Sequence, residues 1–154
     1  MDPELEISGP WDYEHTVSFL SEMKIPIRVA SVGGLGPIVQ SLWFDFDEGS
    51  LWCATQANSV LVKRLSANNQ IGFEVSGDLA PYRGVRGTGV ASIHPELAER
   101  VLHKLIHKYQ GSDESELSRW LLSRLDREVA VKITALKLAT WDFSGRMTAG
   151  KSSE

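Results

Sequence analysis

Cysteine is almost absent from this chain of 154 residues, since Cys53 is the only one. One thiol cannot form an internal disulfide or a thiolate metal cluster, so neither a disulfide framework nor a zinc–thiolate site is expected. Cys53 stands in an apolar segment between Trp52 and Ala54, and no cation next to it in the sequence would lower the pKa of its thiol. We interpret it as a buried structural side chain.

The chain also lacks a long apolar run and an excess of basic residues. Sixteen Lys and Arg face twenty Asp and Glu, which gives a formal net charge of −4. Because a basic surface supplies most non-specific affinity for nucleic acid, and because no run could cross a bilayer, neither a nucleic-acid nor a membrane partner is expected. The first ten residues are acidic and polar, unlike a secretory leader, so a cytoplasmic location is expected.

The remaining composition is that of one globular domain. Apolar residues make up 42% of the chain and charged residues 23%, and 154 residues can bury a core without metal or disulfide support. No internal repeat or linker divides the sequence. We expect the domain over residues 13–147, with a flexible N-terminus over 1–12 and a disordered polar tail over 148–154.

Strand and helix signals follow one another irregularly. Apolar, β-branched and aromatic runs between turn residues predict strands at 27–32, 38–46, 51–54, 71–75, 85–93 and from 129 onwards. Apolar stripes and caps predict helices at 13–22, 59–68, 95–110 and 113–125. Most strands stand at hairpin spacing, so the first three should form an antiparallel meander. The fold class is therefore α+β, mainly β: a closed or split antiparallel barrel of about six strands with flanking helices.

Two of these helices carry more specific expectations. Asp113 with Glu116 has the spacing of a capping box, which would turn Leu117 and Trp120 inward. His103 and His107 lie four residues apart on the preceding helix, but no acid stands between them and no third ligand is evident. We interpret both as surface histidines. No metal site is expected.

The glycine-rich stretch 33–37 follows a strand, as a dinucleotide-binding loop would. However, it lacks the spacing of the third glycine, and a strand rather than a helix comes after it. We interpret it as a hairpin turn.

The segment 55–63 runs from the end of a strand into the start of a helix. Free backbone amides and the helix dipole favour an anion at such a place. The hydroxyls of Thr55 and Ser59 could add donors, and Lys63 lies one turn beyond Ser59 on the same face. The segment is either a phosphate site or only an N-cap followed by a charged helix.

Two further segments combine groups that suit a ring or an anion. Residues 81–89 place Arg83, Arg86 and three glycines in a strand-like segment, where a ligand could approach the backbone, or where a twisted edge strand could expose solvated arginines. Residues 141–147 end the ordered chain with Trp141 and Arg146, which could stack on a ring ligand or close one end of the barrel.

Taken in order, these pieces resemble the pyridoxamine 5′-phosphate oxidase-like family of FMN-binding split barrels, over residues 13–147. The residues that carry the resemblance are 13–22, 25–32, Pro37, 41–44, 51–55, Ser59, Leu65, 68–71, 82–89 and 141–147. The resemblance implies a homodimer with two FMN sites at the subunit interface. It places the flavin ring against the strand 39–44 and the phosphate near the turn 55–63. The cofactor-binding residues expected on this basis are Arg28, Ser41, Leu42, Trp43, Thr55, Gln56, Ser59, Lys63, Arg83, Arg86 and Trp141.

The sequence departs from the oxidase at two points. A basic pair follows the matching serine in the oxidase, whereas Val60 and Leu61 follow Ser59 here. The substrate-binding arginine and histidine pattern near the C-terminus of the oxidase is also not found. We therefore expect a related FMN-dependent oxidoreductase acting on a small molecule, with Lys63, Arg64, Arg83 or Arg86 as the phosphate's basic partner. The alternatives are a deazaflavin (F420)-dependent reductase, a haem protein, and a non-catalytic ligand-binding protein.

Overall fold

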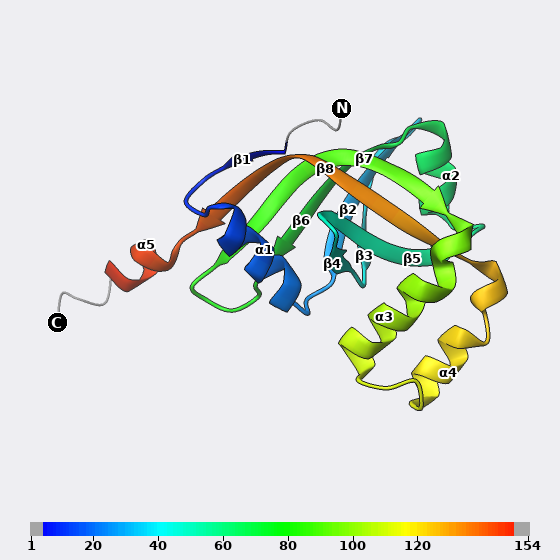
Figure 1. The fold of residues 1–154 in the computed structure, drawn as a ribbon. Coiled ribbons are helices and arrows are strands. Elements are labelled where there is room, and N and C mark those ends of the chain that lie inside the picture. The colour runs from blue at the N-terminus through cyan, green and yellow to red at the C-terminus, as the bar shows by residue number, and fades with distance from the viewer. Residues whose placement is uncertain (1–4, 150–154) are drawn as a thin grey trace.

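The computed structural model describes residues 5–149, and its strands form one curled sheet with helices outside it (Figure 1). The strands are β1 (Glu6–Ser8), β2 (Ile27–Gly33), β3 (Gly36–Leu42), β4 (Asp45–Asp47), β5 (Ser50–Gln56), β6 (Gln70–Ser76), β7 (Arg83–His94) and β8 (Glu128–Asp142). The helices are α1 (Tyr13–Glu22), α2 (Val60–Ala67), α3 (Ala98–Gln110), α4 (Glu116–Leu122) and α5 (Ser144–Ala149), with 3₁₀ turns η1 (Pro95–Leu97) and η2 (Leu125–Arg127). The expected α+β class is confirmed.

The order of the strands makes this sheet a split barrel. Neighbours follow the order β3-β2-β6-β7-β8-β5-β4, and every pair on that path is antiparallel. The two outermost strands, β3 and β4, are separated in sequence by Trp43 and Phe44 alone. The edges of the sheet must therefore meet at these two residues. Because β3 and β4 do not pair with each other among the described residues, the barrel is left open along that seam.

The prediction of a single strand over 38–46 is wrong, because this segment forms two strands, β3 and β4. Phe44 is fully buried, while the Trp43 ring stacks on the Tyr109 ring of α3 with centroids 4.8 Å apart and planes 3° apart. The chain turns a corner at these two residues, because β3 lies at one end of the strand order and β4 at the other. Each of the two strands pairs with its neighbour in sequence, as expected for hairpins: β3 pairs with β2, and β4 pairs with β5.

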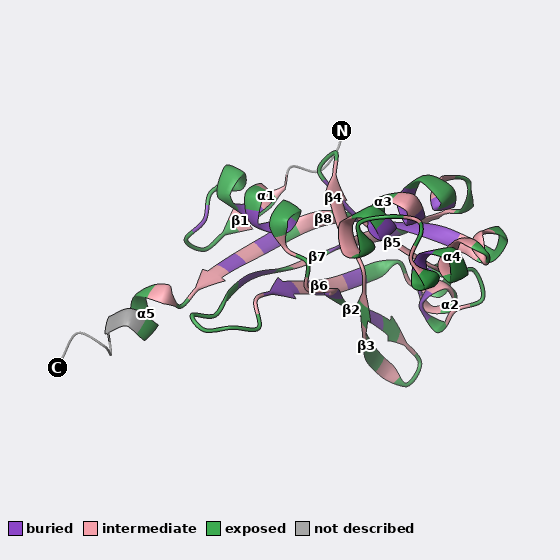
Figure 2. Cartoon of the chain, turned by 90° about the horizontal axis from the view of Figure 1, so that it is seen from below, coloured by how far each residue is buried: buried purple, intermediate pink, exposed green. Residues whose placement is uncertain are grey.

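The core lies inside the barrel, and α1 covers one end of it. Inward residues of the strands, among them Ile27, Val29, Val75, Val85 and Ile133, are at most 1% exposed. Phe19 and Leu20 of α1 join the same cluster. Figure 2 shows purple buried bands separated by less buried ones along part of β8. Leu138 and Thr140 are buried and the residues next to them are less so, which is the period of two expected for a strand with one face in the core, whereas 129–131 are all buried.

A parallel strand, β1, adds to the sheet within the segment 1–12 that was expected to be flexible. It pairs with β8 in the register Glu6–Lys137 to Ser8–Ala139. Trp11 follows and is 6% exposed. The sequence did not predict this strand because three residues are too few for a period to be visible. Residues 1–4 and 150–154, at the two ends expected to be disordered, lie outside the described residues.

Helix α4 differs from its expected form. Its N-cap is Ser115, whose Oγ accepts a hydrogen bond from the amide of Ser118, and Asp113 is therefore not part of a capping box. Leu117 and Trp120, expected to point inward, are 41% and 53% exposed. A helix of seven residues that packs on α3 through the buried Ser118 has little inward face. Helices α1, α2 and α3 lie where helices were expected, whereas α5 was not predicted. None of the described helices is long and apolar enough to span a membrane.

Cys53 should be unreactive in the folded protein. It is completely buried on β5, and burial raises the pKa of its thiol to about 12, an effect that the Lys108 ammonium opposes. Because the thiolate is the reactive form, we expect no reaction with Ellman's reagent at neutral or mildly alkaline pH. One thiol per chain should react once guanidinium unfolds the protein. A rapid reaction of the native chain would contradict the burial of this side chain.

Candidate functional site

Three of the expected cofactor-binding residues lie in one row across the outer face of the sheet. Ser41 of β3 is opposite Arg28 of β2, Arg28 is also opposite Glu74 of β6, and Glu74 is opposite Arg86 of β7. Directly opposed residues point to the same face with Cβ atoms about 4.5–5.5 Å apart. Ser41, Arg28 and Arg86 are exposed, whereas Ile27 and Val29 beside Arg28 and Val85 beside Arg86 are buried in the core. The row combines two cations with one carboxylate between them.

Glu74 is a member of this row that was missed at the sequence level. Its position was visible in the alternation of the strand 71–75, where Ile71, Phe73 and Val75 are buried and Glu74 is not. Only the register shows that it stands between Arg28 and Arg86. The Glu74 carboxylate accepts a hydrogen bond of 3.0 Å from Ser76 Oγ, so a negative charge stands between the two arginines of this row.

The turn before α2 has the form that was expected at 55–63. Ser59 is the N-cap, and its Oγ accepts a hydrogen bond of 3.2 Å from the amide of Val62. The first amides of a helix have no partner within the helix, so those of Val60 and Leu61 are the groups that can meet an anion. Lys63 is exposed one turn further on.

Gln56, in the same turn, is already engaged. Its amide nitrogen donates a hydrogen bond to Glu128 Oε1 of β8. Burial raises the pKa of Glu128, and the hydrogen bond from Gln56 opposes this shift. Thr55 pairs with Val129 in the same ladder. The turn is thus fastened to β8 through a residue, Glu128, that was not singled out in the sequence.

Arg64 fixes α2 to the glycine-rich hairpin. Its guanidinium donates to Ser31 Oγ at 3.0 Å, to the Ser31 carbonyl at 3.1 Å and to the carbonyl of Gly36. It also lies so close to Gly33 that a Cβ there would meet its terminal nitrogens. These bonds occupy the side chain, so Arg64 serves the β2–β3 turn and is not the free basic partner that it was considered to be. The hairpin interpretation of 33–37 is confirmed.

Leu42 and Trp43 lie where the barrel turns its corner. Trp43 stacks on Tyr109, whose hydroxyl accepts a hydrogen bond of 3.4 Å from the amide of Phe44. Lys108 donates to the Phe44 carbonyl at 2.9 Å and lies 3.9 Å from the centre of the Phe44 ring. Burial lowers the pKa of this lysine, and the Asp45 carboxylate opposes that shift. Trp43 is therefore already packed on α3.

Arg83 and Trp141 lie at the other end of the long β7–β8 hairpin. Trp141 pairs with Gly84 and covers it so closely that no Cβ would fit there. The Arg83 guanidinium is 5.7 Å from the centre of the Phe19 ring. Arg83 and Trp141 are far from the start of α2. The residue of β7 that contacts the segment after α2 is Ala91, whose amide donates a hydrogen bond to the Asn69 carbonyl. Eight residues of strand span roughly 26 Å, so one copy of the chain does not bring these residues to the α2 turn.

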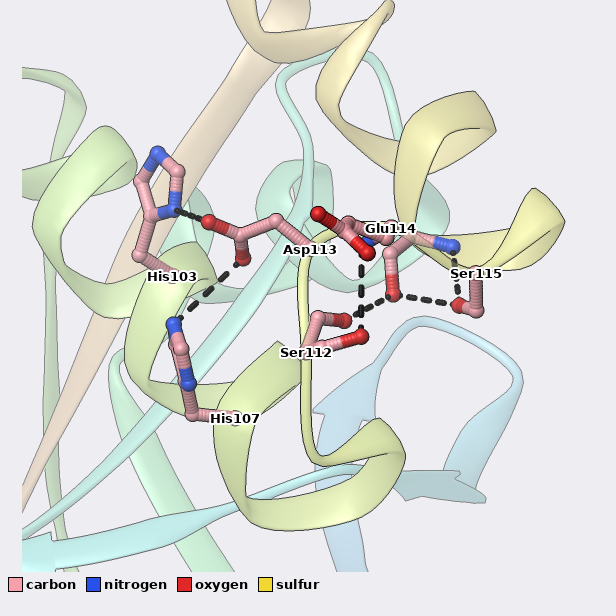
Figure 3. Close-up of polar contacts among 7 residues, drawn as sticks. His103, His107, Ser112, Asp113, Glu114 and Ser115 are labelled. Carbon is pink, nitrogen blue, oxygen red and sulfur yellow. Dashed lines mark hydrogen bonds and ion pairs between the residues drawn. The ribbon is translucent and has the colours of Figure 1, made fainter.

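The histidine pair on α3 has a neighbour that the sequence did not indicate. The left-handed Gly111 ends α3 and turns the chain back, so Asp113 faces both rings, with one oxygen 3.5 Å from His103 Nδ1 and the other 3.5 Å from His107 Nε2 (Figure 3). The histidines remain partly exposed. Among the described residues no group of three His, Cys, Asp or Glu side chains is placed to hold a metal ion.

Several solved structures share this fold. A conserved hypothetical protein from Mycobacterium tuberculosis is 25% identical, with a TM-score of 0.74 and 86% of each chain covered. An F420 reductase is 22% identical, with a TM-score of 0.67, over 84% of this chain and 98% of its own. A candidate pyridoxamine 5′-phosphate oxidase from Listeria innocua is 16% identical, with a TM-score of 0.64, over 85% and 97%.

No protein-family model and no curated protein sequence matches the chain. The likeness is therefore one of fold, and it extends over almost the whole length of the reductase and of the Listeria protein. The antiparallel split-barrel fold is shown by the strand order together with these structures, and what the chain binds must be argued from its own residues.

Proposed function

We propose that this chain binds a flavin-type cofactor between two copies of itself and acts as an oxidoreductase on a small molecule. The observation that carries the proposal is the start of α2 on a barrel of this type. Ser59 caps the helix, Lys63 is free on its surface, and Arg64 fastens the helix to the β2–β3 hairpin. An anion site thus lies beside the strands that would support a ring.

The residues present fit an FMN phosphate, although not in the manner of the oxidase. Backbone amides at the start of α2, the hydroxyl of Ser59 and the ammonium of Lys63 would bind the phosphate. Val60 and Leu61 contribute their amides only. A bound flavin supplies the electron transfer. The chain's own residues orient the ring through β3 and bring positive charge through Arg28 and Arg86 on the outer row.

The need for a second copy is supported by two features of the single chain. Arg83 and Trp141 lie too far from the α2 turn to share a ligand with it, so a partner subunit would have to supply them. In addition, the β2–β3 hairpin and the start of α2 expose apolar side chains, which are Val32 at 45%, Leu35 at 102%, Ile38 at 40%, Val39 at 65% and Val60 at 53%. This concentration of exposed apolar side chains on one hairpin and on the start of α2 supports a protein–protein interface there.

Purified protein mixed with FMN and passed through a sizing column should carry flavin absorbance at a mass of twice 17.1 kDa. Lys63→Ala should weaken FMN binding about tenfold, because a charge-assisted hydrogen bond is worth about 1.5 kcal/mol or more. It should leave the binding of riboflavin, which has no phosphate, unchanged.

Lys24→Ala, at another exposed lysine, is the matched control and should bind FMN as the unaltered protein does. Turnover with a reduced nicotinamide would support the oxidoreductase, whereas flavin that stays bound and never cycles would indicate a binding protein. A monomer that retains FMN would overturn the shared site. A protein that takes up no flavin would overturn the proposal as a whole.

A deazaflavin is the second candidate, and one observation favours it. The F420 reductase is more similar to this chain than the Listeria protein is, in both identity and TM-score. The absence of a basic pair after Ser59 agrees with a cofactor held differently from FMN in the oxidase. Retention of F420 absorbance by protein that rejects FMN would decide in favour of this candidate.

A further inference from the structure

Ser92, His94 and Glu96 form a continuous hydrogen-bonded chain where β7 runs into η1. Ser92 Oγ lies 2.8 Å from His94 Nε2, and His94 Nδ1 lies 3.0 Å from Glu96 Oε1. Each ring nitrogen thus has one partner. A carboxylate accepts a hydrogen bond from Nδ1–H, so Nε2 is left as the acceptor for the serine hydroxyl. This is the atom order of a Ser–His–carboxylate triad.

The local sequence explains how three residues so close together can meet. Ser92 and His94 alternate with Ala91 and Ile93, and therefore share the outer face of β7. Pro95 then starts η1, which ends the strand and returns the Glu96 side chain to the ring. A hydrogen bond from its own backbone amide, followed by that to His94, holds the pKa of Glu96 below its usual range. The carboxylate is therefore ionised at neutral pH.

The surroundings of Ser92 suit a small acyl compound. Lys132 of β8 is directly opposite Ser92, and Trp52 of β5 is directly opposite Lys132, so all three side chains occupy one row on the outer face. The Lys132 ammonium lies 5.6 Å from the centre of the Trp52 ring, and the rings of Trp52 and His94 are 6.1 Å apart. Ser92 thus has a lysine as its neighbour on β8, and the Trp52 ring lies near the imidazole of His94.

The next row of side chains determines how far the His94 imidazole is covered. His94 is opposite Ala130, and Ala130 is opposite Ala54, so the cross-strand neighbours in this row are methyl groups. Ala130 is covered by α3 through Val101 and Leu105. The His94 side chain itself keeps 29% of its surface exposed and Glu96 keeps 66%. A ligand can therefore reach Ser92 Oγ from solvent while the imidazole is backed by protein.

We propose that Ser92 is an activated nucleophile that takes an acyl group from small esters, with His94 as base, Glu96 as its orienting carboxylate and Lys132 as the cation beside the developing oxyanion. This inference is independent of the flavin site. It concerns the β5–β8–β7 face near η1, whereas the flavin proposal rests on α2, on β3 and on the row of Arg28 and Arg86. The chemical class expected is an ester with a compact acyl group and an aromatic alcohol, which could lie on Trp52.

The reaction needs water as its only co-reactant. His94 Nε2 takes the hydroxyl proton while Ser92 Oγ forms a bond to the ester carbonyl carbon. The bond from that carbon to the alcohol oxygen breaks, and His94 returns the proton to the departing alcohol. Water then attacks the acyl-serine in the same way, which releases the carboxylic acid and restores both side chains. No group changes its oxidation state.

A fluorophosphonate probe and p-nitrophenyl acetate test this assignment on the purified chain. The probe should add one phosphonyl group to Ser92, as located by peptide mass spectrometry. The ester should release p-nitrophenol in a burst of about one equivalent followed by slow turnover. Ser92→Ala should remove both the burst and the label, and His94→Gln should lower the acylation rate about 100-fold, which is the usual contribution of a general base.

Ser66→Ala is the matched control, because Ser66 is also exposed but donates its hydroxyl to the Val62 carbonyl. It should keep the full burst and the label. Melting curves of the three variants should overlay that of the parent, since Ser92, His94 and Ser66 are not core residues. An unlabelled parent without a burst, a label on another residue, or a burst that survives Ser92→Ala would each overturn the proposal.

Discussion

Trp11→Ala is expected to lower the free energy of unfolding by about 4 kcal/mol, within the range for a buried aromatic residue cut back to alanine. Trp11 is 6% exposed, and its ring stacks on His15 at 4.4 Å and tilts against Phe19 at 4.8 Å. Its indole nitrogen donates to Asp142 Oδ2 at 3.3 Å. The substitution therefore removes packing and also leaves part of the β8 end unpaired.

Asp142 links this prediction to the C-terminal end of the barrel. Hydrogen bonds from the hydroxyl and then the amide of Ser144, and from Trp11, hold the pKa of Asp142 below its usual range. The Trp11 amide also donates to Thr140 Oγ1 at 3.1 Å, and that hydroxyl donates to the Ser8 carbonyl at 3.0 Å. Residues 8–12 are thus held on β8 by several bonds.

Chemical denaturation with urea measures the effect, and Trp120→Ala is the matched control. Trp120 is 53% exposed, with the Arg124 guanidinium 4.4 Å from its ring centre. The same change there should cost about 0.5 kcal/mol, as is usual at the surface. If the two variants lose equal stability, residues 8–12 do not dock on β8 as described.

Gly89→Ala is expected to cost about 2–3 kcal/mol, the cost of overpacking a site that cannot relax. A Cβ at Gly89 would fall well inside van der Waals distance of the Thr134 carbonyl oxygen, and 3.1 Å from the Cα of Ala135. Both are backbone atoms of β8, so no side-chain rotation can relieve the contact. The register between β7 and β8 also shifts between Thr88 and Gly89, and glycine is the residue that such an irregularity tolerates best.

Gly72→Ala, on the neighbouring strand β6, separates this steric effect from the general effect of replacing a strand glycine. A Cβ there would lie 3.9 Å from its nearest neighbours, Ala30 Cβ and the Gly87 carbonyl. Because alanine restricts the unfolded chain more than glycine does, this variant should be unchanged or slightly stabilised. Thermal or urea melts of the two proteins should therefore move in different directions. A Gly89→Ala variant as stable as its parent would show that β8 can shift at the bulge.

The expected site residues were predicted with uneven success, and the reason differs from residue to residue. The cap at Ser59 and the exposure of Lys63 follow from neighbours in sequence, so the turn before α2 could be recognised. The hydrogen bonds of Arg64 could not be predicted, because their acceptors on Ser31 and Gly36 are 33 and 28 residues away in the sequence. The expected contact of Trp43 with a ring ligand stays a prediction, and its stacking on Tyr109, 66 positions further along the chain, was not visible in the sequence.

The sequence by itself determined the local elements of this protein. The period of two in β6 and β7, the capping serine of α2, the proline before α3 and the glycine after it predict strands and helices because they act within a few residues of one another. Tight turns between successive strands also determined the antiparallel class. Ser92, His94 and Glu96 also stand two residues apart in the sequence. The sequence did not show that Pro95 would start a 3₁₀ turn that directs Glu96 back to the His94 ring.

Tertiary structure decided everything that depends on distant partners. The corner at Phe44 that splits one expected strand, the docking of β1 and Trp11 on β8, and the row of Arg28, Glu74 and Arg86 arise only when the sheet curls and its register is set. The separation of Trp141 from the start of α2 has the same origin. The physical reason is that core packing and cross-strand pairing act between residues brought together by the whole fold, whereas caps, periods and turns act along the chain.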